Sequence, residues 1–126
     1  MILIIGGAYQ GKLDYAREQY PEAAVIQCSD NEPDLELPQE SCIINAFHLF
    51  ILAQVKTGSD SMGYLERNMD VLRNKIIICD DISCGVVPIS AEARIWREST
   101  GRCLGLLSKN ADTVIRLFCG IASIIK

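Results

Sequence analysis

The first twelve residues, MILIIGGAYQGK, limit what this chain can fold into more than any other stretch. Residues 2–5 are all aliphatic, which is typical of a short strand buried in a sheet. Gly6, Gly11 and Lys12 then follow at the G-x-x-x-x-G-K spacing of a phosphate-binding loop. Glycines let a backbone approach a phosphate closely, so that several N–H groups converge on the anion. A helix over residues 13–20 would direct its positive N-terminal end at the same point.

This loop predicts that the chain binds the phosphates of a nucleotide, with the charge of Lys12 at the β- and γ-phosphates. The residues expected to contact the nucleotide are Gly6, Gly7, Ala8, Tyr9, Gln10, Gly11, Lys12 and Leu13. Leu13 stands where the motif has serine or threonine, so it offers no oxygen to a Mg²⁺ ion. A role for Mg²⁺ therefore stays open, and the alternative for the whole stretch is a strand–helix turn that binds no ligand.

The length and composition are those of one domain covering residues 1–126. No apolar run approaches the roughly 18 residues of a membrane span, and no basic segment opens a signal peptide, so we expect a cytoplasmic protein. A formal net charge of −4 argues against a nucleic-acid-binding surface. The cysteines at 28, 42, 79, 84, 103 and 119 include no C-x-x-C pair, which favours reduced core thiols over a disulfide scaffold or a zinc site.

Strand-like and helix-like apolar patterns alternate along the rest of the chain. The expected strands are 23–28, 41–46, 75–80 and 113–119, with a short edge strand in 120–126, and the expected helices are 47–56, 63–73 and 90–110. Residues 29–40 and 81–89 are expected to be connections. Gly101 and Gly105 should either bend the last helix or allow close packing. This order predicts an α/β fold with a mostly parallel sheet, helices on both faces, and ligands beyond the carboxyl ends of the strands.

Polar residues lie at or just after the carboxyl ends of two of the predicted strands: Asn45, Asp80 and Asp81. One of the aspartates is expected to hold a metal ion or to orient a hydroxyl group, and the alternative is a pair of solvated carboxylates. Asn45 offers an amide oxygen but no charge. His48 is favoured as a hydrogen-bonded structural histidine, which would act as an acid or base only if it projected into this edge.

Two arginines in the last predicted helix form a further candidate binding group. Arg94 and Arg97 are three residues apart, so they share a helix face. They would hold phosphate or carboxylate groups of a substrate, or else pair at the surface with Glu92 or Glu98. The spacing alone does not choose between these two roles.

Three blocks of the sequence resemble the bifunctional adenosylcobinamide kinase/adenosylcobinamide-phosphate guanylyltransferases of cobalamin biosynthesis. ILIIGGAYQGK is similar to the strand and G-G-A-x-x-G-K-S loop of that family, and IIICDDISCGVVP to its V-S-N-E-V-G-x-G-I-V-P segment. RIWRESTGR and LLSKNADTVIRLFCGIASIIK are similar to its R-x-F-R-D-x-x-G-R helix, its L-A-x-x-A-D-x-V strand and its G-I-P-x-x-x-K ending. The resemblance implies a RecA-like P-loop NTPase domain with three layers, a homotrimer, and GTP or ATP as ligand.

Members of that family phosphorylate the hydroxyl group of adenosylcobinamide and then transfer GMP to the product through a histidine intermediate. In this chain Leu13 replaces the family's serine, Asn45 its aspartate and Asp81 its glutamate. The segment between the second and third strands, which carries the guanylylated histidine in the family, is much shorter here. His48 aligns elsewhere, so guanylyl transfer by the family route is not expected.

Two hypotheses about function therefore remain. The first is a kinase that moves a γ-phosphoryl group from GTP or ATP to a cobinamide-like acceptor, with Lys12 and Asp81 as catalytic residues and Arg94 and Arg97 as substrate-binding residues. The second is a catalytically inactive regulatory subunit that binds a nucleotide or a corrinoid. The residues Leu13 and Asn45 at the expected Mg²⁺ position favour the second hypothesis, whereas the retained Lys12 and Asp81 favour the first.

Overall fold

The computed structural model describes residues 1–82 and 90–126, and these residues form an α/β fold. The strands are β1 (Ile2–Gly6), β2 (Ala24–Gln27), β3 (Cys42–Asn45), β4 (Ile76–Asp80), β5 (Thr113–Phe118) and β6 (Ile121–Ile124). The helices are α1 (Lys12–Gln19), α2 (Phe47–Lys56), α3 (Ser61–Leu72) and α4 (Ala91–Asn110). The sheet has the order β2-β3-β4-β1-β5-β6, and every pairing is parallel except that of β5 with β6.

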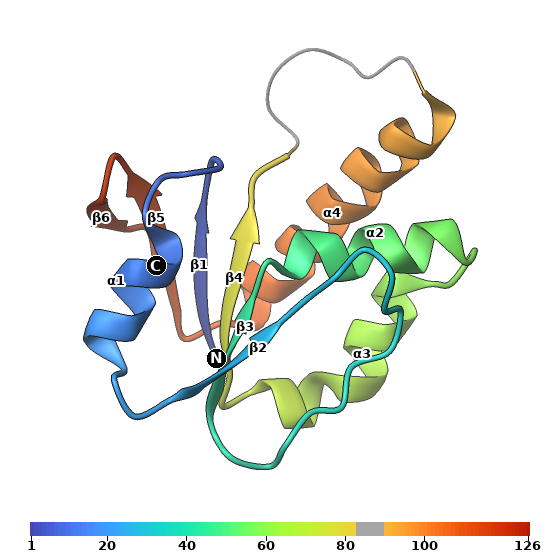
Figure 1. The fold of residues 1–126 in the computed structure, drawn as a ribbon. Coiled ribbons are helices and arrows are strands. Elements are labelled where there is room, and N and C mark those ends of the chain that lie inside the picture. The colour runs from blue at the N-terminus through green and yellow to red at the C-terminus, as the bar shows by residue number, and fades with distance from the viewer. Residues whose placement is uncertain (83–89) are drawn as a thin grey trace.

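Helices cover both faces of this sheet, as Figure 1 shows. Alternate residues along the strands explain the layers, because successive side chains point to opposite faces. Leu3, Ile44 and Ile77 pack in a core with residues of α2, α3 and α4. Their neighbours Ile4, Ile43 and Ile78 pack in a second core with α1. The predicted three-layer arrangement is therefore present, and the described residues place one short helix on one face and three helices on the other.

The predicted elements agree with the observed ones apart from their ends. Helix α1 begins at Lys12, α3 begins at Ser61, and α4 begins after Ser90, whose Oγ accepts a hydrogen bond from the N–H of Ala93 at 3.0 Å. The predicted connection 81–89 lies mostly outside the described residues. Helix α4 runs without interruption through Gly101 and Gly105, and a Cβ atom at either position would meet nothing within 4 Å. The prediction that these glycines allow close packing is wrong, because both face open space.

The described cysteines are free, and four of them are buried: Cys28, Cys42, Cys79 and Cys103. Cys119 is exposed instead, so its prediction as a core thiol is wrong. The physical reason is that Cys119 and Gly120 form the two-residue turn between β5 and β6, with φ values of 50° and 76°. Two positive φ values in a two-residue hairpin are typical of a type I′ turn, whose tip lies away from the sheet core. Cys84 lies outside the described residues.

Candidate functional site

The candidate site lies where two neighbouring strands end and send the chain to opposite faces. Gly6, the last residue of β1, is the register partner of Asp80, the last residue of β4. The chain continues from β1 into α1 on one face, whereas the helix that follows β4, α4, lies on the other face. In open parallel sheets such a point leaves a crevice beyond the carboxyl ends of the strands, and ligands bind there. The glycine-rich loop therefore lies at the position where the topology favours a binding site.

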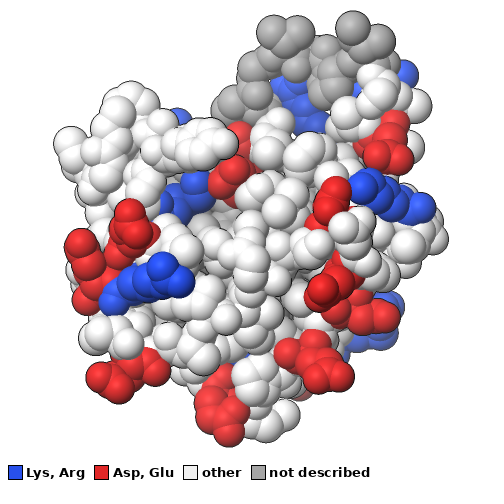
Figure 2. All heavy atoms as spheres, viewed as in Figure 1, with Lys and Arg blue, Asp and Glu red and all other residues white. Residues whose placement is uncertain are grey.

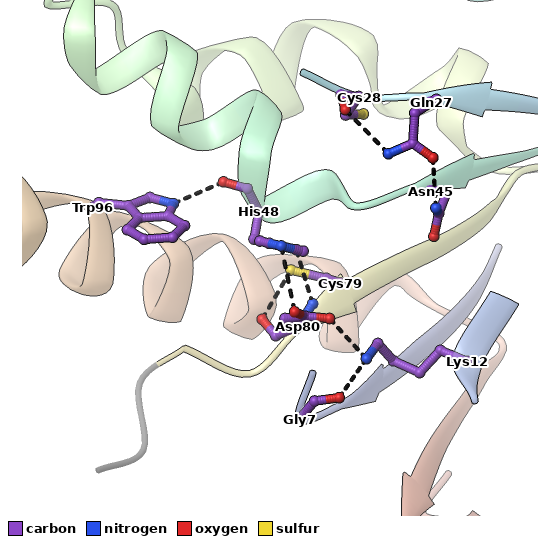
Figure 3. Close-up of polar contacts among 9 residues, drawn as sticks. All are labelled: Gly7, Lys12, Gln27, Cys28, Asn45, His48, Cys79, Asp80 and Trp96. Atoms are coloured by element: carbon purple, nitrogen blue, oxygen red, sulfur yellow. Dashed lines mark hydrogen bonds and ion pairs between the residues drawn. The ribbon is translucent and has the colours of Figure 1, made fainter. Parts of the chain in front are cut away.

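Lys12 is the centre of this site, and it is almost completely buried, with 7% of its surface exposed. Its Nζ donates to the carbonyl oxygen of Gly7 at 2.5 Å and forms an ion pair with Oδ1 of Asp80 at 2.7 Å. Figure 3 shows the lysine side chain from the start of α1 reaching across β1 to the end of β4. The loop thus folds around its own lysine, and the only carboxylate that the described contacts give to Lys12 is that of Asp80.

His48 holds the other oxygen of the same carboxylate. Its Nε2 lies 3.4 Å from Oδ2 of Asp80, and its Nδ1 accepts a hydrogen bond from the backbone N–H of Asp80 at 3.1 Å. Trp96 of α4 donates from Nε1 to the carbonyl oxygen of His48 at 2.7 Å, which fixes the start of α2 (Figure 3). The expectation of a hydrogen-bonded histidine is confirmed, and the side chain also projects into the carboxyl edge of the sheet.

The protonation state of His48 follows from its surroundings. Burial lowers the pKa of His48 below its usual value, the Asp80 carboxylate opposes this effect, and Lys12 adds to it. A lowered pKa keeps the imidazole neutral at pH 7. Because Nδ1 accepts a hydrogen bond, the neutral ring carries its proton on Nε2, which faces Asp80. Asp80 is therefore held between a cation and a neutral hydrogen-bond donor.

An open cavity of about 750 Å³ borders these groups. One wall is the loop and the first turn of α1, and the other is formed by the ends of β2 and β3 and the start of α2. Its lining comprises Ala8, Tyr9, Gln10, Gly11, Lys12, Leu13, Asp14, Gln27, Asn45, Ala46, His48, Leu49, Ile78 and Asp80. On the face shown in Figure 2, charged side chains lie mainly around the border and the middle is largely uncharged. An anionic ligand would thus depend on the loop and Lys12 rather than on a broad basic surface.

Strained backbone gathers around this cavity. The described residues other than glycine with positive φ are Tyr9 at 59°, Ala46 at 59° and Cys119 at 50°. Tyr9 and Ala46 line the cavity, and Cys119 donates its N–H to Oε1 of Gln10 at 2.5 Å. Left-handed backbone costs about 1–3 kcal/mol at such residues and persists only where the surrounding structure enforces it. This clustering is typical of functional sites, where the fold maintains a geometry that local preferences oppose.

The predicted site residues fall into three groups. The loop residues Ala8–Leu13 line the cavity with Lys12, whereas Gly6 and Gly7 line a second cavity of about 250 Å³ on the other side of the loop. Asp81 lines that second cavity as well, and its N–H donates to the carbonyl oxygen of Gly6 at 2.8 Å. Arg94 and Arg97 lie in the first two turns of α4, and neither lines the cavity of Lys12.

The sequence-based site weighed Asp80 and Asp81 together and chose Asp81, and it favoured a structural role for His48, whereas the structure places Asp80 and His48 beside Lys12. The signal that identifies Asp80 is the strand pairing, because the final residues of β1 and β4 are register partners and only one of two consecutive aspartates can face Lys12. Nothing in the sequence pattern places His48 beside Asp80, since that contact spans 32 residues and depends on how α2 starts.

The described residues fit a Mg²⁺ ion poorly. Leu13 offers no oxygen, Asn45 offers only an uncharged amide oxygen, and the Asp80 carboxylate is already paired with Lys12. Within residues 1–82 and 90–126, no three His, Cys, Asp or Glu side chains gather closely enough to hold a metal ion. In the same part of the chain, no helix has both the length and the hydropathy needed to cross a membrane.

A comparison with protein-family models finds none that matches the chain, and no curated protein matches it either.

Proposed function

We propose that this chain binds a nucleoside polyphosphate, GTP or ATP, with its phosphates in the loop formed by residues 6–13. The single observation that carries the proposal is the buried Lys12, whose ammonium group lies 2.7 Å from Asp80 beside an open cavity at the carboxyl edge of the sheet. The loop glycines and the start of α1 supply the N–H groups that a phosphate needs. The resemblance to adenosylcobinamide kinases adds support, since the G-x-x-x-x-G-K spacing is part of it.

The reaction that this arrangement suits is a kinase step, without guanylyl transfer. An acceptor hydroxyl group would attack the γ-phosphorus, the bond from that phosphorus to the β–γ bridging oxygen would break, and the hydroxyl proton would pass to a carboxylate. We assign this last role to Asp80 rather than to Asp81, because Asp80 lines the cavity of Lys12, whereas Asp81 lines the second cavity. Phosphoryl transfer depends mainly on positioning and charge neutralisation, which Lys12 provides. By resemblance, the acceptor is a cobinamide-like molecule, and Arg94 and Arg97 hold its anionic groups.

The second candidate is a regulatory subunit that binds the nucleotide or a corrinoid without catalysis. The observation that favours it is the poor fit of the site to Mg²⁺, since Leu13 brings no oxygen and the Asp80 carboxylate is paired with Lys12. The same family resemblance implies a homotrimer, and both hypotheses retain that expectation.

Calorimetric titration with ATP and GTP, with and without Mg²⁺, tests the proposal. We expect the wild-type chain to bind the nucleotide and Lys12→Ala to lose this binding. Equal affinity of the two proteins would show that the loop does not bind the phosphates. A matched control is Lys56→Ala, which removes an exposed lysine paired with Asp30 at 2.9 Å and should bind normally.

Turnover of adenosylcobinamide with Mg²⁺ distinguishes the two candidates. Phosphorylated product supports the kinase, and nucleotide binding that is indifferent to Mg²⁺ and gives no product supports the regulatory subunit. Leu13→Ser should increase the effect of Mg²⁺ on nucleotide affinity if a hydroxyl ligand is the missing part of the metal site. An unchanged response would show that the metal site is lost more widely.

A further inference from the structure

Tyr9 is an aromatic residue in a position that folding alone does not explain. It lies in the middle of the glycine-rich loop with φ at 59°, in the left-handed region that a bulky side chain rarely adopts. Its side chain is completely exposed, with a relative accessibility of 104%. The protein therefore accepts backbone strain at Tyr9 and gains no buried aromatic surface in return.

The neighbouring residue explains how this conformation is maintained. Gln10 turns toward the β5–β6 turn, where its Oε1 accepts from the N–H of Cys119 at 2.5 Å and its carbonyl oxygen accepts from the N–H of Gly120 at 3.0 Å. Gly11 follows with φ at 86°, and a Cβ atom there would lie 3.6 Å from the Cα of Gly120. Because residues 10 and 11 are held against the hairpin, the side chain of Tyr9 is directed away from the protein.

The ring of Tyr9 is thus displayed at the rim of the cavity that Lys12 borders. Tyr9 and Lys12 both line this cavity of about 750 Å³, which is larger than a phosphate group needs. A phosphate gains little from contact with an apolar ring, whereas the planar base of a nucleotide stacks on one. The loop therefore offers two kinds of contact, a cluster of N–H donors for phosphates and an aromatic face for a base.

We propose that Tyr9 stacks against the heterocyclic base of the nucleotide whose phosphates occupy the loop. This inference rests on the proposed function, since it requires phosphates at Lys12. Stacking uses the π-face that every base has, so Tyr9 should stabilise ATP and GTP to a similar extent. Tyr9 is a binding residue in this account, and its substitution changes nucleotide affinity without changing the affinity of the loop for phosphates alone.

The test compares ATP with inorganic tripolyphosphate, which has the phosphates but no base, as ligands of the full chain. Tyr9→Ala should weaken ATP binding by about five- to 150-fold and leave tripolyphosphate affinity within about a factor of two, a margin well below the smallest stacking effect. Tyr9→Phe, which keeps the ring, should bind ATP like the wild-type chain. Equal losses for both ligands, or no loss for ATP, would overturn the inference.

A glycine variant separates ligand contact from loop stability. Tyr9→Gly relieves the left-handed strain, so its unfolding midpoint in urea should equal or exceed that of the wild-type chain while ATP affinity falls. A variant-independent measurement is the NMR spectrum of the tyrosine ring protons in the wild-type chain. The Tyr9 ring resonances should shift with ATP and stay in place with tripolyphosphate, and identical spectra for the two ligands would contradict stacking.

The proposed function and this inference fail in different ways. If the wild-type chain binds neither ATP nor tripolyphosphate, the phosphate site itself is wrong and Tyr9 has no base to contact. If tripolyphosphate binds through Lys12 but ATP affinity is insensitive to Tyr9→Ala, only the stacking is wrong.

Discussion

Two buried lysines at opposite edges of the sheet have acceptors of different kinds, and comparing them separates a structural lysine from the lysine that we propose binds phosphate. Lys75, 1% exposed, precedes β4 at the amino edge, and its Nζ donates to the carbonyl oxygen of Glu40 at 2.8 Å and to Oδ1 of Asn74 at 2.6 Å. Lys12, 7% exposed, lies at the carboxyl edge and donates to one carbonyl oxygen and one carboxylate. Both are buried cations, yet their acceptors differ in charge.

This difference in acceptors separates the two roles. The hydrogen bonds of Lys75 join the segment before β3 to the turn before β4, and the carbonyl oxygen of Lys75 accepts from the N–H of Ile2 at 3.0 Å. The partner of Lys12 is an anion beside an open cavity, so another anion can compete with it for the ammonium group. Burial therefore does not distinguish the two lysines, whereas the charge of the acceptor does, and the role that we propose for Lys12 rests on that charge.

The largest expected effect is a loss of stability when Lys75, the structural lysine of this comparison, is replaced. Lys75→Ala would remove both hydrogen bonds of a buried side chain and leave a cavity in its place, so the free energy of unfolding should fall by about 3 kcal/mol. Urea unfolding of the variant measures this loss. Calorimetry on the remaining folded protein should give unchanged affinity for tripolyphosphate, and a binding defect there would show that the amino edge takes part in the function.

The next largest effect is a loss of phosphate affinity when Lys12 is replaced. Lys12→Ala should weaken tripolyphosphate binding by about 100-fold, because a buried charge that contacts an anion contributes about 2–5 kcal/mol to such complexes. Titration calorimetry at constant ionic strength measures the change, with Lys56→Ala as the exposed control. Affinity within about threefold of the wild-type value, close to what an exposed ion pair contributes, would place Lys12 in the same structural class as Lys75.

A pH titration sharpens the description of the Lys12 environment. Burial lowers the pKa of His48 from its usual value of 6.5 in the folded protein. As the pH falls below about 6.5, the unfolded chain takes up a proton that the folded chain does not, so stability should decline until the pH reaches the lower folded pKa. His48→Gln should flatten this decline between about pH 7 and 5.5 in urea unfolding experiments. Parallel curves for the two proteins would mean that His48 titrates normally.

The smallest effect is expected for Gly105, a glycine far from the site, and Gly6 is the matched glycine near the site. Gly105→Ala should stabilise the protein by about 0.5–1 kcal/mol, because the site is helical and the added Cβ meets nothing within 4 Å. Gly6→Ala should destabilise it, since its Cβ would lie 2.5 Å from the carbonyl oxygen of Leu117. Thermal unfolding of both variants measures the two signs, and a destabilised Gly105→Ala would contradict the open environment of α4.

The fold could be predicted from local patterns because each element carries its own signal. The aliphatic runs of β1 and β4 and the mostly apolar α2 all appear at the predicted places. The element ends could not be predicted as closely, because α3 begins at Ser61, two residues before its predicted start at Gly63. The environment of Cys119 could not be predicted from its apolar neighbours, because it depends on the turn that joins β5 to β6.

The part of the site that could be predicted is the part whose residues are close together in the sequence. The loop and Lys12 are close in sequence, so their spacing already indicates a phosphate site. The choice between Asp80 and Asp81 depends on strand register, and the place of His48 depends on the left-handed residue Ala46 before α2. Arg94 and Arg97 share the predicted helix, but the direction of α4 determines what they approach, and spacing says nothing about that direction.

The most direct test of the central claim is an amide NMR titration of the wild-type chain with tripolyphosphate. If phosphates bind where we propose, the backbone N–H resonances of residues 7–12 should shift most, and the shifts should disappear in Lys12→Ala. The proposal would be contradicted if saturating tripolyphosphate left these loop resonances in place. It would also be contradicted if the N–H resonances of residues around Lys75 shifted instead.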